Sequence, residues 1–413
     1  MTMHGHASSP AYPLRRMVGW LVLGVLAITL GPGAHAEKKD KKKNSAQQVQ
    51  HASQPVQVDT SKLVWPLPPD PPRIRYLSEL KGEPRAAQPA TPAKKKQSWM
   101  DRLAGLQQVD YQKPVLIRAL MKPYGVVVDS RGRIYAADTY VGAVFIFNSE
   151  TQQVDFIRNG FEARFKTIIG LAIDDNDRLF VVDADLRQVN VFDANHRLES
   201  TFGSDVLERP TGAALDTENR LLYVVDTGKN HVAVFDADSF KLLRTIGTGP
   251  KRDVDEDPGV LLKPTMVAVD RDGNVYVADT LNNRIQIFDA DGHFVSMFGK
   301  HGDAPGTFQR PKGIAIDTDG HIWVADSSLN RIQIFDEEGH LLAYFGEAGT
   351  LPGQFGLPTG LFIDKQNRVI VAEQLKGRLQ LFHYTPDAEA AASKAAGTEE
   401  GGRDQPTATE LGK

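Results

Sequence analysis

The chain has 413 residues with 36 Gly, 24 Pro and no Cys, and its formal net charge is −4. The lack of cysteine excludes disulfides, thiolate metal sites, catalytic thiols and lipid-modified cysteines. A protein that binds nucleic acid usually has an excess of basic residues, and this chain has a small net negative charge, so we expect no nucleic-acid partner. The length and the many turn-forming residues are typical of one large all-β core with tails.

The first 36 residues have the pattern of an export signal. Arg15 and Arg16 precede an apolar run over residues 17–30, and Ala34, His35 and Ala36 form a small-x-small cleavage site. The run is shorter than the roughly 20 residues that span a membrane. We expect cleavage after Ala36, export to the periplasm or the cell exterior, and no membrane span afterwards. An uncleaved anchor is the alternative.

Polar and proline-rich stretches follow. Residues 37–63 begin with a lysine cluster and have too few apolar side chains to fold, so we expect disorder; the lysines are solvated or contact anionic lipid or cell-wall polymer. Residues 64–82 join a proline-rich stretch to the strand-like segment RIRYLSELKG, which we expect along the edge of the folded domain. Peptide binding by the prolines is the alternative. Residues 83–121 are expected to form a linker with a short helix at 98–108.

Four short strands are predicted within residues 263–299. Segments 266–270, 274–279, 284–289 and 293–298 are rich in Val, Ile, Tyr and Phe, and turn residues such as Asp-Arg-Asp-Gly at 270–273 separate them. The unit is therefore an antiparallel meander, and residues 310–346 repeat it almost position for position. Repeats of four strands predict a β-propeller.

Six such units share one register between residues 122 and 383. An acidic residue ends the second strand of each unit, and nine residues after it stands a Phe; the acids are Asp138, Asp183, Asp226, Asp279, Asp326 and Glu373. Another Asp ends each first strand, nine residues earlier or, in the third unit, ten. The predicted fold is all-β: a six-bladed β-propeller of four-stranded antiparallel blades.

The sixth unit has three strands and then passes into a polar tail. A propeller with a missing strand would leave an exposed edge, which invites aggregation. The spare segment at residues 74–80 can fill that place, so we expect the last blade to be closed by an N-terminal strand. Residues 384–413 contain few large apolar side chains, and we expect a disordered tail.

The repeat resembles the NHL repeat. The motifs that carry the resemblance are Pro-x-Gly with a following apolar residue and Asp, then V-x-V-A-D, N-R-I-Q-[IV]-F and a closing F-G, and they stand most clearly in the fourth to sixth units. The second unit is the most divergent, with Thr167 and Ile168 before Gly170 in place of the usual opening. The resemblance implies a six-bladed propeller, but such propellers include lyases, lactonase-like proteins, sensors and binding modules.

The acids that end the second strands are predicted to be structural. Each of the last three is followed five residues later by an arginine, namely Arg284, Arg331 or Arg378, which can pair with it across the turn. An acid that repeats in every blade serves something that every blade needs, whereas catalysis needs a unique constellation. The Asp that ends each first strand is interpreted as turn chemistry.

The histidines do not suggest a shared metal. The NHL-like amidating lyases bind zinc through His ligands, but here His196, His293 and His340 occupy the same outer turn in different blades. His231, His301 and His321 lie in other, separate positions. We therefore expect no catalytic residue, no metal and no cofactor.

A binding face is predicted where the blades begin. Basic and aromatic residues gather in the loops at the start of the first strands and in the neighbouring turns: Lys122, Tyr124, Tyr140, Arg209, Lys263, Arg310 and Lys312. Because loops commonly carry function, we expect these residues to bind a protein partner, or an anionic glycan. The function expected from the sequence is thus an exported, monomeric, non-catalytic binding scaffold in the cell envelope. The alternative is an envelope lyase or hydrolase with a site at the central opening.

Overall fold

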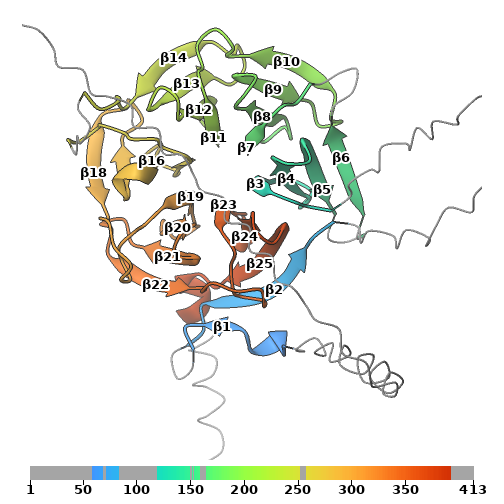
Figure 1. The fold of residues 1–413 in the computed structure, drawn as a ribbon, viewed down its shortest axis with the longest axis vertical. Helices are drawn as coiled ribbons and strands as arrows, with labels where there is room; N and C mark the ends of the chain where they lie inside the picture. Colours follow the sequence, from blue (N-terminus) through green and yellow to red (C-terminus); the bar gives the residue numbers. More distant parts are fainter. Residues whose placement is uncertain are drawn as a thin grey trace, which may run out of the picture. The chain divides into compact units, whose positions relative to one another are not determined.

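Six antiparallel sheets stand in a ring, one for each repeat (Figure 1). The structure is a computed structural model, and it describes residues 58–67, 71–82, 119–148, 151, 153–158, 164–251 and 257–391. These residues belong to one unit, Val58–Lys413. The expected signal peptide, most of the lysine-rich segment and the expected helix at 98–108 lie outside the described residues. The fold is the predicted six-bladed propeller.

Each blade is a meander whose first strand lies nearest the centre of the ring (Figure 1). Blades 1 to 3 consist of β3 (Pro123–Val128), β4 (Ile134–Asp138), β5 (Ala143–Phe147) and β6 (Val154–Arg158); β7 (Ile168–Ile173), β8 (Leu179–Asp183), β9 (Gln188–Phe192) and β10 (Leu198–Phe202); and β11 (Pro210–Asp216), β12 (Leu221–Asp226), β13 (His231–Asp236) and β14 (Leu242–Ile246). Blades 4 and 5 consist of β15 (Val267–Val269), β16 (Val275–Asp279), β17 (Arg284–Phe288) and β18 (Phe294–Phe298); and β19 (Pro311–Ile316), β20 (Ile322–Asp326), β21 (Arg331–Phe335) and β22 (Leu341–Phe345).

Blade 6 contains β23 (Pro358–Ile363), β24 (Arg368–Glu373) and β25 (Arg378–Tyr384), which continue into two strands from the N-terminal part. Strand β2 (Ile74–Leu80) pairs antiparallel with β25, which confirms the predicted ring closure. The blade has five strands rather than the expected four, because β1 (Val64–Trp65) pairs with the outer edge of β2. The Trp65 ring, 5.2 Å from that of Phe345, fixes β1 to the neighbouring blade. The short helices η1 (Thr60–Lys62) and η2 (Thr280–Asn282) lie outside the sheets.

The burial pattern explains the order of strands. Strands β4 and β8 are buried along their whole length, as expected for central strands with apolar side chains on both faces. The outermost strands β10 and β22 alternate between partly buried and exposed positions, because one face contacts solvent. The blades therefore pack face to face around the ring, and the core is divided among the interfaces between them.

The chain remains ordered beyond the predicted end of the propeller. Residues 384–391 were expected to belong to a disordered tail, but Tyr384 ends β25 and residues 387–391 form a helical turn. The backbone N–H of Thr385 donates to the carbonyl of Arg73 at 2.7 Å, and the Arg73 side chain pairs with Asp387. These contacts across blade 6 are the reason for the order. Within the described residues, no helix has both the length and the apolar character needed to cross a membrane.

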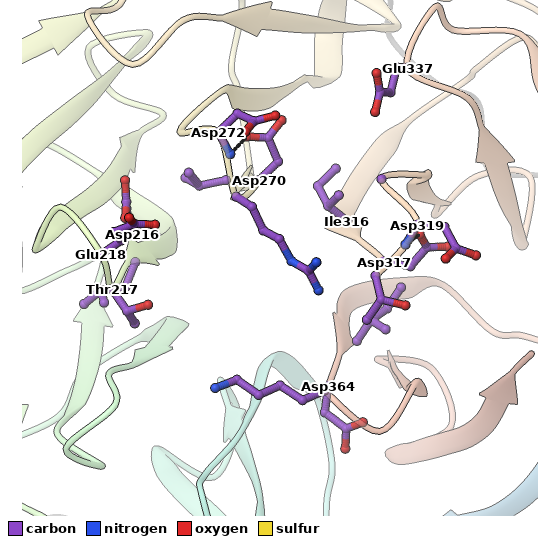
Figure 2. Close-up of a pocket in the computed structure, with 17 residues that line it drawn as sticks. Asp216, Thr217, Glu218, Asp270, Asp272, Ile316, Asp317, Asp319, Glu337 and Asp364 are labelled. Atoms are coloured by element: carbon purple, nitrogen blue, oxygen red, sulfur yellow. Dashed lines mark hydrogen bonds between the residues drawn. The ribbon is translucent and has the colours of Figure 1, made fainter. Parts of the chain in front are cut away.

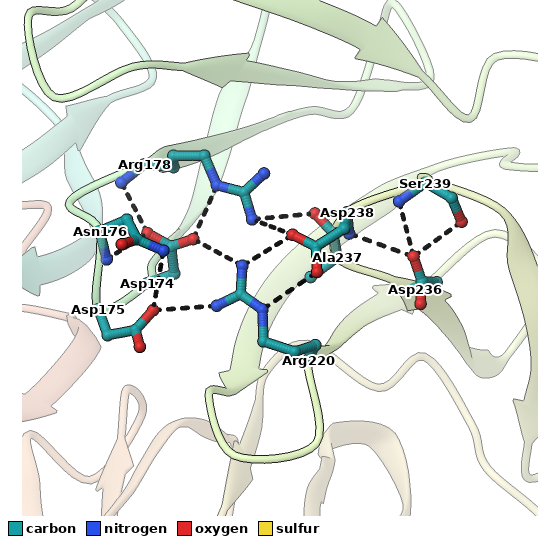
Figure 3. A network of polar contacts seen from close by, with 9 residues as sticks. All are labelled: Asp174, Asp175, Asn176, Arg178, Arg220, Asp236, Ala237, Asp238 and Ser239. Carbon is teal, nitrogen blue, oxygen red and sulfur yellow. Dashed lines mark hydrogen bonds and ion pairs between the residues drawn. The ribbon is translucent and has the colours of Figure 1, made fainter.

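An ion network joins blades 2 and 3 (Figure 3). The guanidinium of Arg220 lies 3.0 Å from Asp175, 3.2 Å from Asp174 and 2.8 Å from Asp238. Arg178 bridges the same two blades through Asp174 and Asp238. The hydrogen bond from Arg220 lowers the pKa of Asp238 to about 2. A network of several charges holds these turns better than separate exposed pairs would.

Candidate functional site

The first strands of all six blades surround a central channel. Their third residue is glycine in five blades, namely Gly125, Gly170, Gly212, Gly313 and Gly360. The strands approach so closely there that a Cβ on Gly360 would lie 1.8 Å from the carbonyl oxygen of Tyr124 in the next blade. In blade 4 the residue two positions after the opening proline, just before β15, is Met266. We call the end of the channel where the first strands begin the Pro end, and the end where they finish the turn end.

A cavity of about 520 Å³ opens at the turn end (Figure 2). Its walls are the turns between first and second strands of blades 3 to 6, together with Glu337 from an outer turn of blade 5. Eight of its lining residues are acidic: Asp216, Glu218, Asp270, Asp272, Asp317, Asp319, Glu337 and Asp364. The cations among them are Arg271 and Lys365. The cavity is therefore strongly acidic but holds both signs of charge.

A second cavity of about 240 Å³ occupies the channel itself. It shares Leu215, Val269, Ile316 and Ile363 with the first cavity, so the two are continuous. Every side chain that lines it is apolar. We call the two cavities together the funnel. A site of this kind, concave, largely apolar in its depth and with polar groups at one end, is the usual form of a small-molecule site.

The acids at the turn end fall into two groups. Acids of the first group, which are partly or fully buried, cap their own turns. Partly buried Asp270 accepts from the side chains of Asn274 and Tyr276, each at 2.9 Å, and buried Asp317 accepts from the Trp323 indole at 2.8 Å. The interpretation of these residues as turn chemistry fits this geometry.

The second group is exposed. No hydrogen bond from the described part of the chain reaches the carboxylates of Glu218, Asp272 and Glu337, which leaves them able to accept from a ligand or water. Arg271 and Lys365 are likewise exposed. Figure 2 shows Glu218, Asp272 and Glu337 on separate turns around one hollow. Carboxylates beside cations can remove a proton and stabilise developing negative charge.

The acids that end the second strands are fully buried and bind backbone amides. In blades 1, 2, 3 and 5 the acid accepts hydrogen bonds from four backbone N–H groups. In blade 5, Asp326 accepts from the N–H groups of Gln309, Arg310, Ser328 and Leu329. The equivalent acids of blades 1 to 3 are Asp138, Asp183 and Asp226. In blades 4 and 6 one backbone N–H group donates and side chains supply the rest, namely Arg and Gln in both blades and also Asn282 in blade 4. Arg284 lies 2.9 Å from Asp279, and Arg378 lies 2.6 Å from Glu373.

The third predicted pair is absent. Arg331 donates to the carbonyl of Asp303 at 3.2 Å and lies over the ring of Tyr344, not against Asp326. The physical reason is that backbone amides already occupy both oxygens of Asp326. In blades 4 and 6, by contrast, Lys263 and Leu357 have positive φ, and their N–H groups donate to an Asn of the preceding blade instead. In these two blades the arginine side chain donates to the acid in place of the backbone N–H group that points toward the Asn.

The predicted binding residues lie at the Pro end, opposite the funnel mouth. The Lys122 ammonium lies 5.8 Å from the Tyr140 ring, Arg209 lies 3.6 Å from Asp185, the Lys263 side chain donates to the carbonyl of Thr227, and Arg310 is exposed. Tyr124 does not belong to a surface, because it is 8% exposed and packs in a core cluster. Lys312 is partly buried above it, with its Nζ 5.7 Å from the ring centre. None of the seven lines the funnel.

The histidines stand apart from one another. His196 contacts the Tyr135 hydroxyl at 2.9 Å, and His321 contacts Asp317 and the Tyr384 hydroxyl, each at 3.1 Å. Among the described residues, the one group of three whose ligand atoms lie within 4.8 Å of one another is Asp336, Glu338 and His340. That group is on an outer turn and does not line the funnel. The residues at the channel therefore do not fit a His-bound zinc of the amidating-lyase kind.

Comparison with known proteins finds that parts of the chain are similar to enzymes of the propeller class. Residues 267–346 match the family model described as SMP-30/gluconolactonase/LRE-like region. Over 111 residues the chain is 31% identical to a probable peptidyl-alpha-hydroxyglycine alpha-amidating lyase of Caenorhabditis elegans; the match covers 27% of this chain and 31% of that relative's length. The chain thus spans about a third of the curated relative. The chain is an NHL-like six-bladed propeller, as its repeats predict.

Two solved structures have the same fold. A Bacteroides thetaiotaomicron protein of unknown function matches with a TM-score of 0.52 and 16% identity, over 65% of this chain and 70% of that one. A gluconolactonase of Xanthomonas campestris matches with a TM-score of 0.50 and 17% identity, over 64% of this chain and 88% of that one.

The expected non-catalytic scaffold is wrong. The family model and the lyase relative are those of enzymes, and they favour the alternative drawn from the sequence, a lyase or hydrolase with a site at the central opening. From the sequence, the Asp that ends each first strand is interpreted as turn chemistry within its own repeat, and the acids that follow it in the turn, such as Asp272, are assigned no role. A ring of repeats brings equivalent turns together at one end of the axis, and that symmetry was the signal that could have indicated the site.

Proposed function

We propose that the protein is an exported hydrolase or lyase that acts on a small molecule bound in the funnel. The observation that carries the proposal is the funnel itself, a cavity at the centre of the ring with unpaired carboxylates and two cations at its mouth. The matched family region, residues 267–346, supplies ten of the seventeen residues that line the mouth. Lactone hydrolysis is therefore the first reaction to test.

The residues of the mouth supply a base and cations for such a reaction. A carboxylate, Glu218, Asp272 or Glu337, takes a proton from water, and the resulting hydroxide attacks the lactone carbonyl. Arg271 and Lys365 stabilise the negative charge on the carbonyl oxygen until the ring C–O bond breaks, and the carboxylic acid returns its proton to the alcohol oxygen that leaves. Positioned bases contribute about 10²–10⁴-fold and electrostatic stabilisation about 10²–10³-fold per donor.

Elimination is the second candidate, because the Caenorhabditis elegans relative is named as an amidating lyase. One of the same carboxylates would then remove the α-hydroxyl proton of such a substrate, and the same cations would stabilise the developing alkoxide. The C–N bond breaks as the carbonyl forms, and the leaving amide nitrogen takes the proton from the carboxylic acid. A panel that contains aliphatic lactones and a peptide ending in α-hydroxyglycine distinguishes the two reactions, since each releases a different product.

The matched variants are Glu337→Gln and Glu338→Gln. These neighbours stand on one outer turn and are both exposed, but Glu337 alone lines the funnel mouth. We expect the double variant Arg271→Ala with Lys365→Ala to lower kcat/KM by at least about 100-fold. Glu337→Gln should lower it by about 10-fold or more if Glu337 is the base, and Glu338→Gln should leave it unchanged. No turnover of either substrate class, or turnover that survives the double variant, would contradict the proposal.

Export is part of the same proposal and rests on the N-terminal 36 residues. The pattern of basic residues, apolar run and small-x-small site predicts that the mature chain begins at Glu37. N-terminal sequencing of the protein recovered from an envelope fraction tests this. A chain that retains its first residues in that fraction would favour the uncleaved anchor.

A further inference from the structure

The repeats are unequal at one position that faces the channel. Five first strands carry glycine as their third residue, and blade 4 carries Met266. Its side chain extends toward blade 3, where its Sδ lies 2.5 Å from the point that a Cβ on Gly212 would occupy. Met266 also lines the channel cavity, and it is 8% exposed. The methionine therefore fills space at the axis that the glycines leave open.

Met266 and Tyr124 lie toward the Pro end of the channel. Both belong to one core cluster, which also contains Ile169. Tyr124 is in blade 1 and Met266 in blade 4, and these blades stand opposite each other in a ring of six, so the cluster crosses the axis (Figure 1). The ammonium of Lys312 lies over the outer side of the Tyr124 ring. The channel is thus a tube that opens at the acidic mouth.

The dimensions and lining of the tube favour a slim apolar group. Its volume is about 240 Å³, and its side chains are aliphatic apart from Met266 and Phe362. A buried cavity of roughly 150 Å³ with a comparable lining stays dry and binds benzene. The mouth, in contrast, has eight acids and two cations. A ligand that fits both parts has a positive charge at one end and an apolar chain at the other.

We propose that the funnel binds a slim cationic amphiphile, with its ammonium-type head among the acids of the mouth and its chain in the channel. Met266 and Tyr124 form the floor that sets the longest chain. The inference deepens the proposed function by naming its substrate class, and for catalysis it rests on that proposal. The binding geometry can be tested without turnover.

The experiment is calorimetric titration of the protein with n-alkylammonium ions of increasing chain length, kept below micelle-forming concentrations. Each added methylene should tighten binding about fourfold until the chain reaches the floor, after which the affinity should stop rising. Met266→Ala should extend the rising part of the series by one or more methylenes. Met297→Ala, at a 40% exposed methionine of the outer strand β18, should leave the series unchanged.

The charge of the head is tested with n-alkyl sulfates of the same lengths. We expect them to bind at least about tenfold more weakly, because the mouth is acidic. Equal binding of sulfates and ammonium ions, or a plateau that Met266→Ala does not move in a variant that melts cooperatively, would overturn the inference. Alkylammonium binding without any turnover would refute the proposed function and leave this inference intact. Lactone turnover without chain-length-dependent binding would refute this inference and leave the proposed function intact.

Discussion

Single residues in this protein take different partners according to the backbone around them. The acid that ends each second strand is buried in all six blades, yet in four blades backbone amides bind it and in two blades an arginine does. The difference follows from one φ angle per blade, positive at Lys263 and at Leu357. The arginine is thus a replacement for a missing amide, and its energetic role should be confined to those blades.

A pair of double-mutant cycles tests this account. Asp279→Ala should lower the free energy of unfolding by about 1–3 kcal/mol, because it leaves buried donors unsatisfied. Combined with Arg284→Ala it should cost at least about 0.5 kcal/mol less than the sum of the single changes. The same cycle at Asp326 and Arg331 should be additive. Urea unfolding measures both; coupling in blade 5, or additivity in blade 4, would contradict the account.

The second residue-scale prediction concerns pH. The hydrogen bond with Asp317 raises the pKa of His321, against the effect of burial. A raised pKa means that the folded state favours the protonated ring. The resulting contribution of His321 to the free energy of unfolding is therefore fully present below the pKa of the unfolded state, about 6.5. It is lost as the pH rises through the pKa of the folded state. In blade 4 the equivalent residue is Asn274, which donates to Asp270 without titrating.

His321→Asn is therefore a matched variant that keeps a donor and removes the charge. The wild-type advantage in unfolding free energy over this variant should be larger at about pH 5 than at about pH 8. An advantage that is constant over this range, or that grows with pH, would show that His321 is not protonated in the folded protein.

At the scale of elements, the strand β2 completes a blade that the C-terminal repeat begins. It covers β25 along seven residues, and its Glu79 lies 2.8 Å from the buried guanidinium of Arg378. The outer strand β1 adds the contacts of Trp65 with two phenylalanines, at 5.2 and 5.9 Å.

Stepwise truncation separates these contributions. A chain that starts at residue 98 lacks both strands and should lose much of its stability or aggregate, since β25 becomes an exposed edge. A chain that starts at residue 71 lacks η1 and β1 but keeps β2, and it should melt at a lower temperature but remain monomeric. A chain that starts at residue 58 is the control. If the shortest chain were monomeric and melted like the control, the closing role of β2 would be refuted.

The strands of the propeller could be predicted from the sequence wherever the sequence pattern repeats from blade to blade. Spacing between acids, glycines and phenylalanines is enough to place six blades, and the missing strand of the last one identifies residues 74–80 as its partner. Strand β1 was not predicted because its two residues, which precede a proline, are too few to show the alternation of apolar and polar side chains that marks a strand. The order of residues 384–391 escaped it because it depends on Arg73, more than 300 positions away. The site was missed because its acids converge only once the ring is closed.

At the scale of the whole molecule, the ring depends on close contact between neighbouring first strands. The contact between blades 6 and 1 is the one that joins the end of the propeller to its beginning. Gly360→Ala would place a Cβ 1.8 Å from a backbone oxygen of Tyr124, so the strands would have to separate. Overpacking of this kind typically costs about 1–3 kcal/mol.

We expect Gly360→Ala to lower the melting temperature and to widen the channel on the side of Tyr124, which thermal unfolding and the alkylammonium series would both detect. Gly249→Ala is the matched control: its nearest neighbour would be 3.4 Å away, and its φ is not positive. Equal melting temperatures for the two variants would show that the first strands have room to move apart.

The closure of blade 6 also determines when folding can finish. Glu79 and Arg378 are separated by 299 positions, so the two halves of this blade leave the ribosome at opposite ends of synthesis. Five blades can form in the meantime, while β2 has no strand to pair with. Contacts at such separation form late and slowly. A chain interrupted anywhere before β25 therefore keeps β2 without its partner, and an unpaired strand of this kind can pair with another chain instead.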